Sequence, residues 1–266
     1  MYRGFQLKLR KYFPLFGDEF ECCRSAGEDL FEEHQNEVKS VLDDFLLSDG
    51  SIDGSKMQEN WFPQIKADIF ISHSHQDKDL AMALAGWLCK KFRLKSFIDS
   101  CVWGYADDLK ELLCQTYRKH SYPRDSSLHL FVSSHVDMML SVALNQMIDN
   151  TECLFFLNTP NSISFDAPVC STTSSPWIYS EIAMSRLIRK QVPERLKRLN
   201  ESQDTFSKKL IRYRLPMDHL PIVNEEDMSK WEVDRRLISY FEKSYFLDKL
   251  YKLVDKKAEQ KIRSLK

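Results

Sequence analysis

The chain has 266 residues, 43% of them hydrophobic and 29% charged, which is the balance of an ordinary globular protein and excludes a disordered or fibrous one. Its formal net charge of −1 provides no overall basic field, so we expect no nucleic-acid partner. The seven cysteines form no CxxC pair, which argues against structural zinc and favours a reducing, cytoplasmic location.

The first region, residues 1–64, is predicted to be a helical N-terminal extension. Its opening residues mix basic and aromatic side chains without an uninterrupted apolar segment, so we expect no signal peptide. Apolar residues at helical spacing in GEDLFEEHQNEVKSVLDDFLL (27–47) predict an amphipathic helix, which a turn-rich linker follows. No run of about 18 apolar residues is evident in the chain, and we therefore expect no membrane contact.

From residue 65 to about 225, strand and helix patterns alternate in the way that is typical of a parallel α/β sheet. The segment near 119–133 interrupts this alternation, and we read it as an insertion or a short extra strand. Prolines in IRYRLPMDHLPIV restrict the last strand pattern to a sheet edge. An amphipathic pattern at 231–256 predicts a C-terminal helical extension over residues 226–266. Three apolar runs predict the main strands: ADIFIS (67–72), LKSFIDS (94–100) and ECLFFLNT (152–159).

Polar segments follow these strands. They are SHSHQDK (72–78), DSCVWGYADD (99–108) and the loop that ends in SSPWIYSE (174–181). Because the carboxyl ends of parallel strands meet at one rim, we expect these segments to lie close together. One helix is predicted to begin near Asp77, with Asp77 as its cap. Another is predicted to begin after Ser175. Two helix N-termini at one rim favour an anionic ligand such as a phosphate.

These segments carry a resemblance to TIR (Toll/interleukin-1 receptor) domains. ADIFISHSHQDKDLA resembles the first box of that family, and SFIDSCVWG lies where its BB loop follows the second strand. ECLFFLNT followed by SSPWIYSEI resembles its third strand and its Ser-x-Trp-Cys-x-x-Glu signature. The match spans about residues 67–190, with Ile178 where many members have Cys and without the usual Pro-Gly in the second box. The resemblance implies a flavodoxin-like TIR fold, a central parallel sheet flanked by helices.

The resemblance also implies an activity. Many TIR domains cleave NAD⁺ at the nicotinamide–ribose bond, giving nicotinamide and ADP-ribose or a cyclic isomer, with the Glu of this signature, here Glu181, as the essential acid. NAD⁺ would be a substrate, and no separate cofactor or metal is expected. Stand-alone bacterial TIR proteins often serve antiphage (Thoeris-type) defence, so the implied partners are further copies of the chain, through TIR contacts, and a downstream effector that senses the nucleotide product.

Nicotinamide in NAD⁺ is already a cationic leaving group, so the reaction mainly needs a fixed carboxylate beside the oxocarbenium-like ribose. We expect Glu181, near a helix N-terminus, to stay ionised at pH 7 and to supply it. Backbone N–H groups around Ser72, His73 and Ser74 could hold phosphate. His73 and His75 lie in a strand-end loop without a neighbouring Cys, which disfavours metal binding.

Three aromatic residues and one acid complete the predicted substrate-binding set. Trp103 or Tyr105 could stack on nicotinamide or adenine. Asp99 could orient the BB loop or contact the ribose. Trp177 lies four residues before Glu181 and so shares its helix face, where packing under the site is the more frequent role.

Two other functions fit the same residues. The first is a non-enzymatic TIR adaptor that only mediates TIR–TIR assembly, although adaptors commonly lack an acid at the position of Glu181. The second is a nucleoside 2-deoxyribosyltransferase-like hydrolase, which would use a similar lone glutamate on a related fold.

Overall fold

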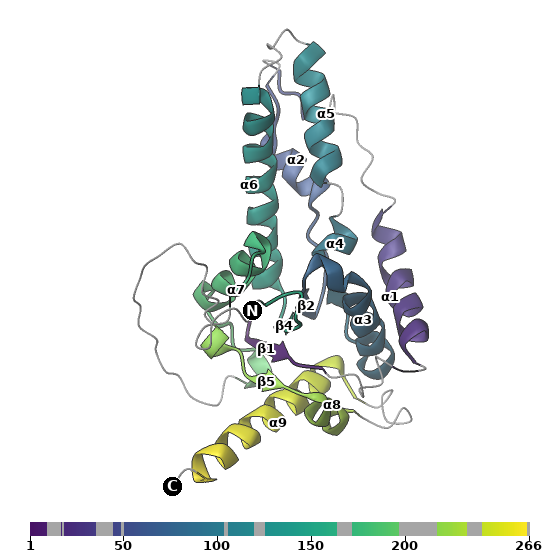
Figure 1. Cartoon of the computed structure of the whole chain (residues 1–266), viewed down its shortest axis with the longest axis vertical. Coiled ribbons are helices and arrows are strands. Elements are labelled where there is room, and N and C mark those ends of the chain that lie inside the picture. Colours follow the sequence, from purple (N-terminus) through teal and green to yellow (C-terminus); the bar gives the residue numbers. More distant parts are fainter. Residues whose placement is uncertain are drawn as a thin grey trace.

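The computed structural model describes residues 1–9, 17, 19–35, 45–48, 51–103, 106–119, 126–163, 172–196, 217–232 and 241–264. Within this part of the chain lies one five-stranded sheet in which every pairing is parallel, in the order β3-β2-β4-β1-β5. Its strands are β1 (Arg3–Leu7), β2 (Ile69–Ser72), β3 (Ser96–Phe97), β4 (Cys153–Leu157) and β5 (Ile222–Val223). The predicted parallel α/β sheet flanked by helices is confirmed (Figure 1).

The position of β1 corrects the predicted division of the chain. Residues 1–64 are not wholly a helical extension, because β1 pairs with β4 on one side and β5 on the other, inside the sheet. In flavodoxin-like sheets the strand order is 2-1-3-4-5. Here β3, β2 and β4 follow that pattern, but the fourth place is taken by the N-terminal strand instead of a strand that follows β4.

Helices cover the sheet and extend beyond it. A single helix of 25 residues, Ser126–Asn150, covers most of the described part of the segment that interrupts the alternation and continues beyond it. A short strand over 126–131 is therefore wrong. The C-terminal pattern is divided into two helices, with residues 233–240 outside the described part. The α-helices are α1 (Phe20–Gln35), α2 (Gly54–Trp61), α3 (Lys78–Phe92), α4 (Asp99–Val102), α5 (Ala106–Lys119), α6 (Ser126–Asn150), α7 (Pro176–Leu187), α8 (Glu225–Trp231) and α9 (Lys243–Ser264), and the 3-10 turns are η3 (His75–Asp77), η4 (Glu194–Leu196) and η5 (Met217–His219).

Two glycines let α1 and α3 cross in backbone contact. A Cβ atom on Gly86 would lie 1.9 Å from the carbonyl oxygen of Cys23, and one on Gly27 would lie 2.1 Å from that of Met82. Only a residue without a side chain fits at such distances. The crossing therefore fixes α1 against α3, the helix that follows β2.

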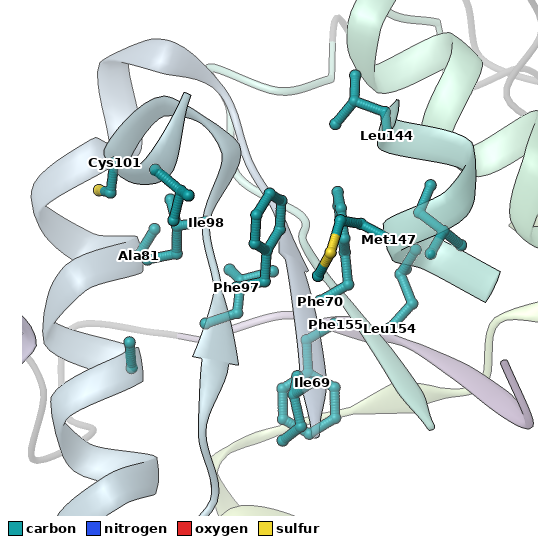
Figure 2. Close-up of a cluster of buried hydrophobic side chains, with 14 of the residues drawn as sticks. Ile69, Phe70, Ala81, Phe97, Ile98, Cys101, Leu144, Met147, Leu154 and Phe155 are labelled. Carbon is teal, nitrogen blue, oxygen red and sulfur yellow. The ribbon is translucent and has the colours of Figure 1, made fainter. Parts of the chain in front are cut away.

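The core lies on both sides of the central strands (Figure 2). Ala81 of α3 and Cys101 of α4 lie on one side, and Leu144 and Met147 of α6 lie on the other. Between them are the buried side chains of the strands, which are apolar at nearly every position because a parallel sheet covered on both faces has no solvated side. Those shown are Ile69, Phe70, Phe97, Ile98, Leu154 and Phe155.

The length and composition of α6 do not fit the expectation that no segment could contact a membrane. Its residues Ser127–Asn150 are long enough and apolar enough to cross a bilayer, by length and composition alone. In the sequence this helix shows no continuous apolar segment, because polar Ser, His and Asn residues divide its apolar pattern into short runs. In the fold, α5 and α6 run side by side and reach away from the sheet (Figure 1).

Candidate active site

Glu181 lies at the carboxyl-terminal edge of the sheet, held against the end of β2. Its helix, α7, begins as predicted, with Pro176 in the first turn and the Ser175 hydroxyl accepting a hydrogen bond from the backbone N–H of Ile178. Glu181 is in the second turn, not the first, so it does not cap the helix. Its side chain is buried, and its Oε2 accepts a 2.5 Å hydrogen bond from the hydroxyl of Ser72, the last residue of β2.

The environment of Glu181 works against the expected ionised state. Burial raises the pKa of Glu181 well above the ordinary value, and the nearby negative charge of Asp99 raises it further. The hydrogen bond from Ser72 opposes both effects but is the smallest of the three. The helix N-terminus cannot reverse this result, since its field falls off within the first turn. The environment of Glu181 therefore favours the protonated form of its carboxyl group.

His73 links the end of β2 to the start of α4, where Asp99 lies near Glu181. The Nδ1 atom of His73 lies 3.4 Å from the carbonyl oxygen of Ile71 and 3.8 Å from Asp99 Oδ1. Its Nε2 atom lies 3.1 Å from the Ser100 hydroxyl. A proton on Nδ1 suits the Ile71 carbonyl oxygen and leaves Nε2 to accept from Ser100, whereas Asp99 lies beyond hydrogen-bond distance. His73 thus lies beside the acid that acts on Glu181, and its imidazole is committed to protein groups.

A second polar cluster joins the loops after β2 and β4. The carboxylate of Asp77 accepts hydrogen bonds from the Thr159 hydroxyl at 2.5 Å and from the Asn161 amide at 2.8 Å. Asp77 occupies the cap position before α3, as predicted, but makes no side-chain bond to that helix. Ser74 accepts a hydrogen bond from the Asp77 backbone N–H through its carbonyl oxygen. Sequence reasoning missed Thr159 and Asn161, although their place directly after the strand ECLFFL was a usable signal.

Of the aromatic candidates, Trp103 and Trp177 pack against the core. Trp103 is buried, packs edge-on against Phe62 and Phe97, and donates its indole N–H to the carbonyl oxygen of Pro63. In this position both of its faces belong to the core, so stacking on a ligand would require it to move. Trp177 is partly buried against the core. Tyr105 lies outside the described residues.

The strand ends thus bring together Ser72, His73, Asp99 and Glu181, with Ser74 and Asp77 beside them. In the described part of the chain no group of three or more His, Cys, Asp or Glu side chains has the spacing of a metal site. A cavity of about 430 Å³ lies elsewhere, between α6 and the residues after α7. Its lining residues are Val142, Asn145, Gln146, Asp149, Ile188, Arg189 and Gln191, none of which belongs to the Glu181 cluster.

What the cluster can do follows from its charge. A buried carboxyl group whose pKa is raised ionises more readily when a cation is placed beside it, because the cation offsets the cost of burying the charge. The site is therefore suited to a positively charged or charge-developing ligand.

In comparisons with known proteins, no family model, no curated protein and no solved structure matches the chain.

Proposed function

We propose that the chain is an enzyme that cleaves the nicotinamide–ribose bond of NAD⁺ and releases nicotinamide. The observation that supports this most is the buried Glu181 carboxyl group, bound by Ser72 and flanked by Asp99 at the carboxyl ends of parallel strands. Ligands of open α/β sheets bind at this edge. The resemblance to TIR domains places the essential acid of such enzymes at the same residue.

The proposed reaction uses the charge of the substrate. The nicotinamide ring carries a positive charge, which favours the ionised form of Glu181 when NAD⁺ binds. The C1′–N bond breaks with its electron pair on nicotinamide, which leaves neutral. Positive charge then develops on the ribose, where the fixed Glu181 carboxylate stabilises it. Water, or another nucleophilic atom of the substrate itself, bonds to C1′ and releases a proton that the carboxylate can accept. The first route gives ADP-ribose and the second a cyclic isomer.

The other roles in this proposal follow from position. Ser72 holds the carboxylate by hydrogen bonding, and Asp99 adds to the rise in its pKa that burial causes. Backbone N–H groups around His73 and Ser74 are the proposed contacts for phosphate. By the same resemblance, the product would act as a signal for a separate effector protein in the cytoplasm, and assembly of several copies would accompany activity.

The test is the release of nicotinamide from NAD⁺ by the purified chain, with both products identified by mass. We expect release by the unaltered protein and none by Glu181→Gln. Glu59→Gln, which changes an exposed glutamate on α2, is the matched control and should keep full activity. A Glu181→Gln variant that is folded and fully active would remove the basis of the proposal.

The pH dependence of kcat/KM separates a reacting carboxyl group from a structural one. Free Glu181 must ionise before it can stabilise a cation, so kcat/KM should be low in acid and rise through the raised pKa. Asp99→Asn removes a neighbouring negative charge and should move this rise to lower pH. Ser72→Ala removes the hydrogen bond to the carboxylate and should move the rise to higher pH. Shifts in the same direction would contradict the assignment.

One observation favours a second candidate, cleavage of a nucleoside whose leaving base is neutral. That reaction needs a protonated acid for the base and a carboxylate for the ribose, and beside Asp99 the raised pKa of Glu181 favours the acid form. Incubation with nucleoside 5′-monophosphates beside NAD⁺ decides between the two. Release of a base from the monophosphates alone would assign the site to a nucleoside hydrolase or transferase.

A further inference from the structure

The most exposed apolar surface in the described part of the chain lies on α6. Four of its large apolar side chains are exposed: Leu130 by 70%, Phe131 by 50%, Met138 by 64% and Val142 by 38%. At 100° per residue these four positions fall within one third of the helix circumference. Together with Ser134 and His135, which are exposed between them, they form a continuous strip that we call the α6 stripe. Apolar side chains gathered in this way mark an interaction surface, unlike single exposed ones.

The α6 stripe is held rigidly by the partner helix behind it. The opposite face of α6 packs on α5, with Val132 and Val136 buried. Phe131 is fixed by edge-on contacts with Tyr117 of α5 and with His135. Side chains that are already ordered lose little conformational entropy on binding, which favours association.

We propose that the α6 stripe is the interface between two copies of this chain, which pack their α6 helices antiparallel about a two-fold axis near Ser134. The stripe is self-complementary about this residue. Leu130 and Phe131 of one copy would lie over Met138 of the other, and Ser134 of each copy would lie at the axis. A small residue at the crossing point lets two helices approach closely.

The polar groups of the stripe allow it to be buried. The Ser134 hydroxyl donates a 2.7 Å hydrogen bond to the Leu130 carbonyl oxygen of its own helix, so it needs no partner at the axis. The stripe contains no Lys, Arg, Asp or Glu. The nearest acid, Asp137, is paired at 3.0 Å with Lys110 of α5. Two copies can therefore meet without repulsion between like charges.

A second copy fits the stripe better than a lipid surface does. Peripheral helices that lie on membranes are rich in Lys or Arg on the polar face and carry Trp, Phe or Leu on the apolar face. The stripe has Leu130 and Phe131, but no Lys or Arg occurs anywhere in α6. The exposed surface of the four apolar side chains amounts to roughly half of the ~800 Å² that each partner of a standard interface buries. We accordingly expect a weak dimer whose population depends on concentration. The stripe includes no residue of the Glu181 cluster, so the dimer is independent of the proposed reaction.

Sedimentation velocity of the full chain across a hundredfold range of concentration tests the association. We expect the unaltered protein to shift from monomer to dimer, and Met138→Lys to weaken the dimer at least tenfold. The matched control is Leu47→Lys, which changes another exposed apolar side chain, 49% exposed, outside the stripe. A protein that stays monomeric at the highest concentration, or a dimer that Met138→Lys leaves unchanged, would overturn the proposal.

Disulfide trapping tests the antiparallel arrangement. In Ser134→Cys the new thiols of two copies would meet at the axis and form a disulfide-linked dimer under mild oxidation, beyond the background of the unaltered protein. In Gln146→Cys the thiols would be about 36 Å apart, because twelve residues separate each from the axis, and should not link. Linking of both variants would show a parallel pair and contradict the two-fold axis.

Flotation with neutral phosphatidylcholine vesicles tests the lipid alternative. If the protein forms no dimer but floats with the vesicles, and Met138→Lys abolishes the flotation, the stripe is assigned to lipid instead.

Discussion

Replacing Glu181 with glutamine should change how the stability of the protein depends on pH, whether or not the protein is an enzyme. Glutamine keeps the shape of the side chain and an oxygen that can accept the hydrogen bond from Ser72. It removes the only group at this position that can ionise. Any difference in the pH dependence of unfolding between the two proteins therefore reports the titration of Glu181.

The sign follows from the raised pKa of Glu181 in the folded state. The folded protein binds this proton more tightly than the unfolded chain, in which the pKa is about 4.3. The stabilisation is thus fully present below about pH 4.3 and is lost as the pH rises through the folded-state pKa. Across that window the free energy of unfolding of the unaltered protein should fall by about 1.4 kcal/mol per pH unit relative to Glu181→Gln.

Urea unfolding of both proteins at pH 5 and at pH 8 measures this difference. We expect the two free energies of unfolding to be close at pH 5 and the glutamine variant to be the more stable at pH 8. Parallel pH profiles for the two proteins would falsify the raised pKa of Glu181. Asp99→Asn is an informative third protein, because loss of its charge should lower the folded-state pKa of Glu181 and so narrow the pH window over which the stability falls.

Three further predictions concern the fold around the site. Gly86→Ala places a Cβ atom 1.9 Å from the Cys23 carbonyl oxygen, so we expect a loss of about 1–3 kcal/mol and a fall of several degrees in the Tm by calorimetry; an unchanged Tm would show that α1 separates freely from α3. Asp77→Asn leaves one acceptor where two donors converge, so urea unfolding should show a loss of about 1–3 kcal/mol, and a neutral result would refute the bridging role. Burial raises the pKa of Cys101 to about 11, so thiol-labelling mass spectrometry of the native protein should find exposed Cys22 modified and Cys101 unmodified; rapid labelling of Cys101 would contradict its burial.

The sequence predicted the parts of the fold that depend on local pattern. The apolar runs that became β2 and β4 were long enough to be recognised, and Ser175 with Pro176 marked the start of α7. From strand direction alone, Ser72 and Glu181 could be placed at the same edge, where a hydrogen bond joins them. The first turns of α6 were expected to be an insertion or a short extra strand, because polar residues there hide the helical period.

The remaining features depend on contacts between distant residues. β1 is a five-residue strand whose partners lie about 150 and 215 positions later, and no local pattern identifies them. The protonation of Glu181 depends on burial and on the position of Asp99, 82 residues earlier in the chain. Trp103 was expected in a surface loop, since its role in the core requires the Pro63 carbonyl oxygen and two phenylalanine rings from other segments.

The place of β1 in the sheet has a consequence for synthesis on the ribosome. This strand is made before the other strands of the sheet, and its neighbours β4 and β5 follow about 150 and 215 residues later. At about 5–20 residues per second, roughly 10–45 s pass between the synthesis of β1 and that of β5. Before β4 appears, β2, β3 and the glycine crossing of α1 with α3 can assemble while both edges of the first strand are open, and the edge that pairs with β5 stays open for longer. The nascent chain therefore completes its sheet by inserting its oldest strand late, the step at which a chaperone or a wrong partner has most time to bind.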